Sequence, residues 1–210
     1  MDSLIRFVLV AVGIAIALAA LLWLNLAHRP WVGVQDVKVR NNWPTQVDGK
    51  LRFDLSVELK NVGKSPAVVL RTAASAITSN EWSSAQKKRC NEARAEIQAS
   101  DLYHWTVLPD QIWPYHAPAV TEKPLSEIRA SGDDEIYVMI VGCVLYRSIF
   151  DDAIYATSFV ARVSEEDQND RKHIETRGAI NPIRLNHLID PPKDRLLIIK
   201  DVSMPGEPPR

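Results

Sequence analysis

The hydrophobic positions near the start of the chain follow one another without interruption. Residues 7–24 read FVLVAVGIAIALAALLWL, a segment with no charged and no strongly polar side chain. At about 1.5 Å of rise per residue, a helix of this length nearly crosses a hydrocarbon core of about 30 Å. Arg6 can reach the near interface, and Pro30 ends the helix because its ring cannot continue the hydrogen-bond ladder. The pattern predicts a transmembrane anchor over residues 1–29 that contacts the lipid bilayer through residues 4–27.

A cleaved signal peptide is the main alternative to an anchor. Its apolar core is usually roughly 7–15 residues long and is followed by a small-x-small cleavage site. The apolar segment here is longer, and LNLAH near Ala27 places leucine where a small residue is needed. A helix buried in a soluble core is also disfavoured, since no face of residues 7–24 is polar. We therefore expect an uncleaved signal-anchor with a single membrane pass.

The orientation of the anchor depends on the charges that flank it. Arg29, Lys38 and Arg40 follow the apolar segment, whereas Arg6 precedes it, and this count alone favours a cytoplasmic C-terminal domain. Lys38 and Arg40, however, fall in the first predicted strand of a folded domain, and long translocated domains largely escape the rule. We therefore predict an inner-membrane location with the C-terminal domain in the periplasm.

Beyond the anchor, hydrophobic and polar positions alternate. In residues 51–60 every odd position is apolar and every even position is polar or charged, which predicts a strand with one face on a core and one face in water. The preceding valines change parity between Val34 and Val37, which predicts a bulge near residues 35–36. The intervening residues 41–50, NNWPTQVDGK, carry the Asn, Pro and Asp-Gly that are typical of a loop.

A turn with the sequence NVGKSPA closes this strand at residues 61–67. Gly63 can take a positive φ there, and Asn61 can bond its own backbone. The segment 135–148 is apolar on both faces and is predicted to be a central strand covered on both sides. Other strands are predicted at residues 68–78, 153–163 and 195–199.

A predicted helix at about residues 83–99 interrupts the strands, and Ser83 or Ser84 can cap it. Its thin apolar stripe predicts a surface helix laid over one edge or end of the sheets; the stripe comprises Ala85, Cys90, Ala93 and Ile97. Several strands with long alternating pairs indicate a mainly β domain, a two-sheet antiparallel sandwich over residues 30–204. Residues 205–210 are rich in proline and are expected to form a disordered tail.

Composition narrows the function classes only a little. The 25 lysines and arginines nearly balance the 26 acidic residues, which disfavours a nucleic-acid binder driven by net charge. Cys90 and Cys143 permit one disulfide and require none. Buried unpaired thiols are the alternative for these two residues.

No catalytic motif is present in the chain. The five histidines lack a second histidine or cysteine at the spacing of a zinc motif. Paired acids at 133–134, 151–152 and 165–166 fall in predicted turns, where solvated turn residues are more common than acid/base pairs. The sequence therefore predicts no catalytic residue, no metal site and no cofactor.

One segment is a candidate for binding a partner. The stretch DLYHWTVLPDQIWPYH contains four aromatic residues in a predicted loop-rich region: Tyr103, Trp105, Trp113 and Tyr115. Exposed aromatic rings on a β scaffold can stack on sugars or contact a protein. The alternative interpretation is that these rings cover the open end of the sandwich core.

Several short motifs resemble a group of uncharacterised bacterial membrane-anchored proteins. RPWV follows the apolar helix, NVGKSPA closes a strand, VLPDQ stands at 107–111, and GCVLYRSIFDDAIYATSF stands at 142–159. The matching positions are Asn61, Gly63, Pro66, Ala67, Pro109, Tyr146, Phe150, Thr157 and Phe159. The resemblance implies a single-pass anchor and an immunoglobulin-like sandwich, and it implies no catalytic residue.

These observations leave three classes of function. The first is a membrane-anchored, non-enzymatic envelope protein that serves as a structural module or recognises a protein partner as yet unidentified. The second is a glycan- or peptidoglycan-binding module that uses the aromatic segment 103–115. The third is an enzyme whose site is assembled from dispersed residues.

Overall fold

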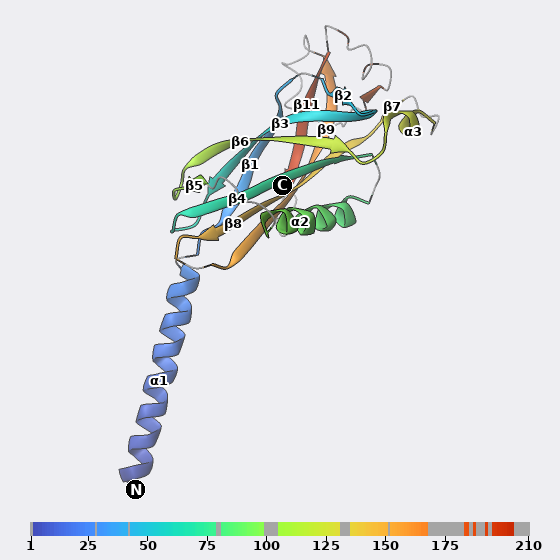
Figure 1. Ribbon diagram of the computed structural model, residues 1–210. Coiled ribbons are helices and arrows are strands. Elements are labelled where there is room, and N and C mark those ends of the chain that lie inside the picture. Colours follow the sequence, from blue (N-terminus) through green and yellow to red (C-terminus); the bar gives the residue numbers. More distant parts are fainter. Residues whose placement is uncertain are drawn as a thin grey trace.

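A computed structural model shows a long N-terminal helix followed by a β domain (Figure 1). It describes residues 2–27, 29–41, 43–78, 81–98, 105–130, 135–150, 152–167, 183–184, 187, 192 and 195–203. Tyr103, the acid pair 133–134 and the predicted tail 205–210 lie outside the described residues. The helices are α1 (Asp2–Ala27), α2 (Trp82–Gln98) and α3 (Leu125–Ala130). The strands are β1 (Val32–Val39), β2 (Thr45–Val47), β3 (Lys50–Asn61), β4 (Ala67–Ile77), β5 (Trp105–Val107), β6 (Ile112–Thr121), β7 (Glu135–Ile136), β8 (Val138–Ser148), β9 (Ile154–Asp167), β10 (Ile183–Arg184) and β11 (Arg195–Ser203).

Helix α1 extends away from the β domain (Figure 1). Every one of its side chains that the structure describes is exposed, namely Phe7 and those of residues 9–20. In the part of the chain that the structure describes, no helix is both long enough and apolar enough to cross a membrane. The prediction of a membrane-spanning helix is therefore not confirmed by the structure.

The main sheet is nearly closed. Its strands follow the order β1-β3-β6-β4-β8-β9-β11, with β2 beside β3 and β5 beside β4. Strand β6 joins β4 through a short parallel pairing of residues 74–76 with 119–121, whereas β3 and β6 pair antiparallel along most of their length. The sheet also comes close to closing on its other side. There the Thr157 hydroxyl of β9 donates a hydrogen bond to the Val32 carbonyl oxygen of β1 at 2.6 Å. The prediction of a mainly β domain is confirmed. The sheet is continuous because β6 pairs with both β3 and β4, and so joins one half, β1-β3-β6, to the other half, β4-β8-β9-β11.

The core lies between the two halves of the sheet. Burial alternates residue by residue along β3, as predicted. Phe53 and Leu55 from β3 share one hydrophobic cluster with Ile140 and Val144 from β8. Gly142 provides room for the ring of Phe159, because a Cβ atom there would lie 2.1 Å from that ring. The cluster therefore joins the two halves by packing as well as by hydrogen bonds.

Helix α2 covers the outer face of β4, β8 and β9. Its apolar stripe packs on these strands, with Ala93 beside Ala73 and Leu145. This position differs from the expected edge or end, and it explains why β8 is apolar on both faces: one face meets the core and the other meets α2. Cys90 of α2 and Cys143 of β8 form a disulfide.

Three local features refine the sequence-based expectations. The bulge in β1 is confirmed, because the register with β3 shifts between Val34 and Asp36. The expected loop at 41–50 contains a tight hairpin from β2 to β3, in which Asp48 and Gly49 have φ of 51° and 74°. Such positive φ values suit Asp-Gly in a two-residue turn. The last strand is longer than predicted and continues to Ser203.

Candidate functional site

Three of the four predicted aromatic residues come together on the surface. We call Trp105, Trp113 and Tyr115 the aromatic cluster. The ring centroids of Trp105 lie 6.1 Å from Trp113 and 5.3 Å from Tyr115. Contrary to the prediction of a loop-rich segment, these residues belong to strands β5 and β6.

The registers of β5 and β6 show why these rings meet. Trp105 lies opposite Val69 of β4, and Val69 is buried in the core. Trp113 and Tyr115 lie opposite Leu59 and Val57 of β3, which are also buried. Because residues directly opposite in an antiparallel pair share a face, all three rings stand on the core-facing side of the sheet.

The aromatic cluster bridges the two halves of the sheet where their backbones are not paired. The same edge of β4 carries β5 at residues 67–69 and β6 at residues 74–76. The first part of β6 therefore leaves β4, and the rings lie across the gap between β6 and β5. Trp105 and Trp113 remain 40% and 38% exposed, while Tyr115 is half-buried against the main core. The cluster both covers the open end of the core and offers aromatic surface to solvent.

Strand β6 is poorly suited to accept a further strand at this gap. Pro114 and Pro118 lie within it, in register with Glu58 and Asp54 of β3. Proline has no backbone N–H to donate to β3. In the antiparallel pairing with β3, the backbone of Pro114 and Pro118 therefore faces the other edge of β6. Two places on that edge thus lack a donor, which protects it against strand addition. A partner at the aromatic cluster would therefore contact side chains.

Asn61 holds the end of the domain next to α1 together. Its side-chain amide donates hydrogen bonds to the carbonyl oxygens of Ser65 at 2.8 Å and Val107 at 3.0 Å. Its side-chain oxygen accepts hydrogen bonds from the backbone of Trp31 at 3.3 Å and Gly63 at 3.0 Å. This fully buried side chain therefore ties the NVGKSPA turn to the start of β1 and to β5.

Gly63 is needed for space and not for a positive φ, which the sequence had allowed there. The described glycine with a positive φ is Gly49. A Cβ atom on Gly63 would lie 2.5 Å from the backbone nitrogen of Trp31 and 2.6 Å from the carbonyl oxygen of Arg29. The turn thus lies directly against the backbone that leads from α1 into β1.

A buried carboxylate lies at the other end of the domain. Glu165 in β9 is only 3% exposed, although its acid pair was expected to lie in a solvated turn. One of its oxygens lies 2.7 Å from Nδ1 of His187, and the other accepts a hydrogen bond from the backbone of Arg184 at 3.1 Å. Trp43 meets the His187 ring edge to face at 6.4 Å. Sequence reasoning missed this pair because Glu165 and His187 are far apart in the chain and match no motif.

The Glu165–His187 pair links β9, β10 and residue 187. A carboxylate can fix the tautomer and orientation of an imidazole ring. Among the described residues, however, no three His, Cys, Asp or Glu side chains come together in a group that could hold a metal ion. The hydrogen bonds of Glu165 tie β10 and His187 to β9.

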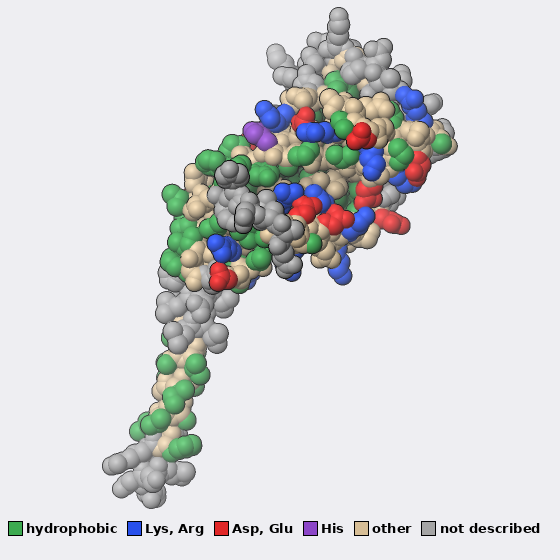
Figure 2. Space-filling model, viewed as in Figure 1, with side chains coloured by type: hydrophobic (Ala, Val, Ile, Leu, Met, Phe, Trp, Pro, Cys, Tyr) green, Lys and Arg blue, Asp and Glu red, His purple; other side chains and the backbone are tan. Residues whose placement is uncertain are grey.

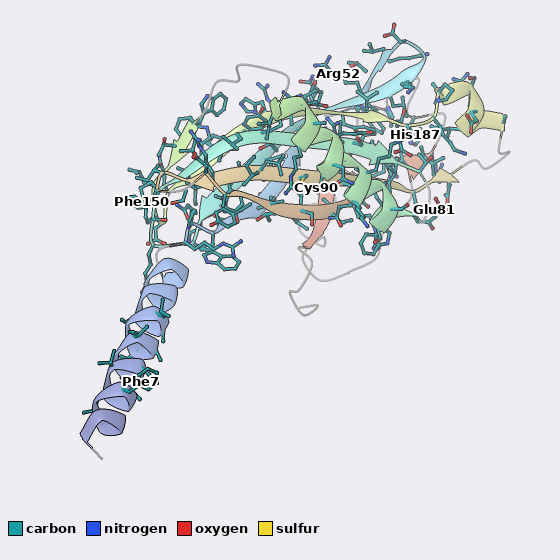
Figure 3. All side chains as sticks on the ribbon, turned by 60° about the horizontal axis from the view of Figure 1, so that its bottom comes forward. Phe7, Arg52, Glu81, Cys90, Phe150 and His187 are labelled. Carbon is teal, nitrogen blue, oxygen red and sulfur yellow. A yellow bond between two sulfur atoms is a disulfide. The ribbon has the colours of Figure 1, made fainter. Side chains whose placement is uncertain are left out.

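The end of the domain next to α1 carries exposed hydrophobic side chains. Figure 2 shows hydrophobic side chains gathered on the β domain close to the α1 junction. Phe150, which is 73% exposed, lies at this end, whereas His187 and Glu81 lie at the other (Figure 3). Phe150 and Ile149 also border an open hollow of about 300 Å³, together with Val68, Arg147, Ser148 and Asp152. Arg147 is neutralised there by Asp152 at 3.1 Å.

Comparisons of the chain with protein-family models, with curated proteins and with solved structures found no match. The resemblance to uncharacterised bacterial membrane-anchored proteins therefore stays a prediction.

Proposed function

We propose that this chain is a membrane-anchored, non-enzymatic envelope protein whose β domain acts as a structural or protein-interaction module. The observation that carries the proposal is the exposure of α1. Among the side chains of α1 that the structure describes, seven large apolar ones are at least half exposed: Phe7, Leu9, Val10, Val12, Ile14, Ile16 and Leu18. Apolar surface of this extent is unfavourable in water and favourable in lipid. A lipid bilayer is the environment that suits α1.

The inferred orientation places the β domain in the periplasm. The disulfide between Cys90 and Cys143 supports this location, because disulfides persist in oxidising compartments and are rare in the cytosol. We further infer that the two halves of the sheet form an immunoglobulin-like sandwich. Their shared hydrophobic cluster supports this inference.

Membrane association can be tested by extraction of isolated membranes with alkaline carbonate. We expect the full chain to stay in the membrane pellet, and a variant lacking residues 1–27 to be soluble and folded. Replacing two apolar residues on one face of α1 in a double variant, Ile14→Asp with Leu18→Asp, should release the chain as well. The matched control is Val47→Asp, an exposed apolar residue of the β domain, which should leave the chain in the pellet. Full extraction of the unaltered chain would contradict the proposal.

Orientation has a separate test. Alkaline phosphatase fused after Arg210 should be active, because this enzyme needs an oxidising compartment to form its disulfides. Activity of a cytoplasmic reporter at the same position, with an inactive phosphatase, would reverse the orientation.

The aromatic cluster is the candidate contact site for a partner of the β domain. Exposed Trp and Tyr side chains are frequent hot spots of protein interfaces, and Trp105 and Trp113 keep part of their rings in solvent. A photo-reactive amino acid in place of Trp113 should capture a protein in native membranes. The same group in place of Tyr137, which directly precedes β8, should not. A glycan or peptidoglycan ligand is the second candidate, favoured by stacked rings at the surface. Soluble peptidoglycan fragments should then react with the photo-reactive group at position 113 and reduce its capture of protein.

A further inference from the structure

Large hydrophobic side chains are exposed on one end of the β domain, next to α1. We call Trp31, Val62, Leu108, Ile149 and Phe150 the apolar rim. Each of these residues is about half exposed or more. They come from four separate segments of the chain: the start of β1, the turn after β3, the turn after β5, and the turn between β8 and β9.

Hydrogen bonds and strand registers place these segments at the same end. The backbone nitrogen of Val62 donates to the carbonyl oxygen of Trp31 at 2.8 Å. The turn that contains Leu108 is joined to Asn61 through the Asp110 nitrogen, also at 2.8 Å. Ser148, which directly precedes Ile149, pairs with Ala67 at the start of β4. Because α1 ends only a few residues before Val32, the apolar rim lies at the end of the domain from which α1 extends, and Figure 3 shows Phe150 at this end.

The polar residues at this end suit the interface between lipid and water. Arg29 stacks on the rings of Trp31 and Tyr155, with its guanidinium carbon 4.8 Å and 4.0 Å from their centroids. Lys64 is exposed in the turn beside Val62. Tryptophan rings prefer the headgroup region, and basic side chains near an apolar surface favour anionic headgroups. Phe150 and Ile149 have no such polar atoms, which makes their side chains suited to the acyl boundary.

We propose that the apolar rim rests in the surface of the lipid bilayer and holds the β domain against the membrane. This inference rests on the proposed function, because α1 must bring the domain to the bilayer. In water, five large apolar side chains around one end of the domain would stay hydrated at a free-energy cost, and burial at the lipid interface removes that cost. The domain is then not a freely moving head on a tether, and the aromatic cluster stands close above the membrane.

The test uses the full chain in vesicles of phosphatidylethanolamine with phosphatidylglycerol. Both native cysteines are joined in a disulfide, so an introduced cysteine is the available thiol for a spin label. The test variant is Phe150→Cys, and Ile149→Cys repeats the measurement next to it. The matched control is Tyr137→Cys, since Tyr137 is 58% exposed and directly precedes β8, whereas Ile149 directly follows it. Ile14→Cys reports on α1 itself.

Relaxation by oxygen, which is enriched in lipid, is compared with relaxation by a water-soluble nickel chelate. We expect the oxygen-to-nickel ratio at positions 149 and 150 to be several-fold higher than at 137, and lower than at position 14, which lies near the middle of the apolar segment 7–24. A lipid-like ratio at 14 together with equal, aqueous ratios at 149, 150 and 137 overturns the apolar rim and leaves the anchor standing. An aqueous ratio at 14 overturns both proposals.

Discussion

Asn61 donates a hydrogen bond from its side-chain amide to the backbone carbonyl oxygen of Val107, 46 residues further along the chain. Together with the bond to Ser65, it uses both hydrogens of the amide in a fully buried site. The start of β1, the NVGKSPA turn and β5 therefore depend on one side chain.

The first prediction concerns this amide. Asn61→Asp keeps the shape of the side chain but replaces the donor nitrogen by an oxygen that faces two carbonyl groups. We expect the free energy of unfolding to fall by about 3 kcal/mol, because a buried polar network loses both donors and gains a charge. Chemical denaturation measures the change. Asn91→Asp on the exposed face of α2 is the matched control, and equal effects at both sites would contradict the role of Asn61.

The second prediction concerns the two faces of β3. Leu55 is 1% exposed in the core, so Leu55→Asp should lower the stability by about 4 kcal/mol or more. Ser56 points to the other face, and Ser56→Asp should shift the unfolding midpoint very little. Urea melts of both variants provide the comparison. A large loss for Ser56→Asp would mean that the outer face of β3 is covered too.

The third prediction concerns the contact between the NVGKSPA turn and the start of β1. Gly63→Ala should lower the stability by about 3 kcal/mol, because the added carbon would overlap backbone atoms that cannot rotate away. Gly13→Ala in α1 is the control, since a Cβ atom there meets nothing within 4 Å. Thermal melts of the β domain should separate the two variants. A wild-type midpoint for Gly63→Ala would show that the close approach relaxes without cost.

The fourth prediction concerns the disulfide. Cys90 and Cys143 are separated by 53 residues, and closing a loop of this length stabilises a fold by about 4 kcal/mol in the chain-entropy account. Replacing both with alanine should therefore lower the denaturation midpoint substantially. α2 should also detach more easily, because Arg71–Glu96 is then its main ion pair with β4. Hydrogen exchange should show faster opening of α2 than of β3; unchanged exchange in α2 would argue against the disulfide as its main tether.

The fifth prediction separates the two roles of the aromatic cluster. Trp105→Ala should cost about 2 kcal/mol of stability, because its ring packs against two others while part of it stays in solvent. Trp105→Phe should restore most of that stability. If the cluster binds a partner, Trp105→Phe should still weaken crosslinking to that partner by a photo-reactive amino acid at position 113. Full crosslinking by a stable Trp105→Phe variant would limit Trp105 to closing the core.

Part of the candidate site could be predicted from the chain alone. The aromatic segment is visible because four large rings fall within a short stretch, and three of them do form a cluster among the described residues. The Glu165–His187 pair is not visible, because a buried carboxylate looks the same in sequence as a solvated one. Its burial depends on how β10 and the residue at 187 lie against β9, which is a long-range contact.

The sequence by itself determined the features that depend on neighbouring residues. The period of two in residues 51–60 set which face of β3 is buried, the change of parity before residue 37 set the bulge in β1, and the apolar faces of residues 138–148 required cover on both sides. These are local consequences of side chains that alternate along a strand. They hold whichever strands become neighbours.

Only the tertiary structure decided which surfaces meet. The same alternating strands can form two separate sheets or one, and the short pairing of β4 with β6 selected a nearly closed sheet. The tertiary structure also placed α2 over a face of the sheet instead of an edge. It made Gly63 necessary for a close approach of two backbone segments instead of an unusual φ. Each of these outcomes depends on contacts between residues distant in the chain, whose free energies no local pattern of hydrophobic and polar residues encodes.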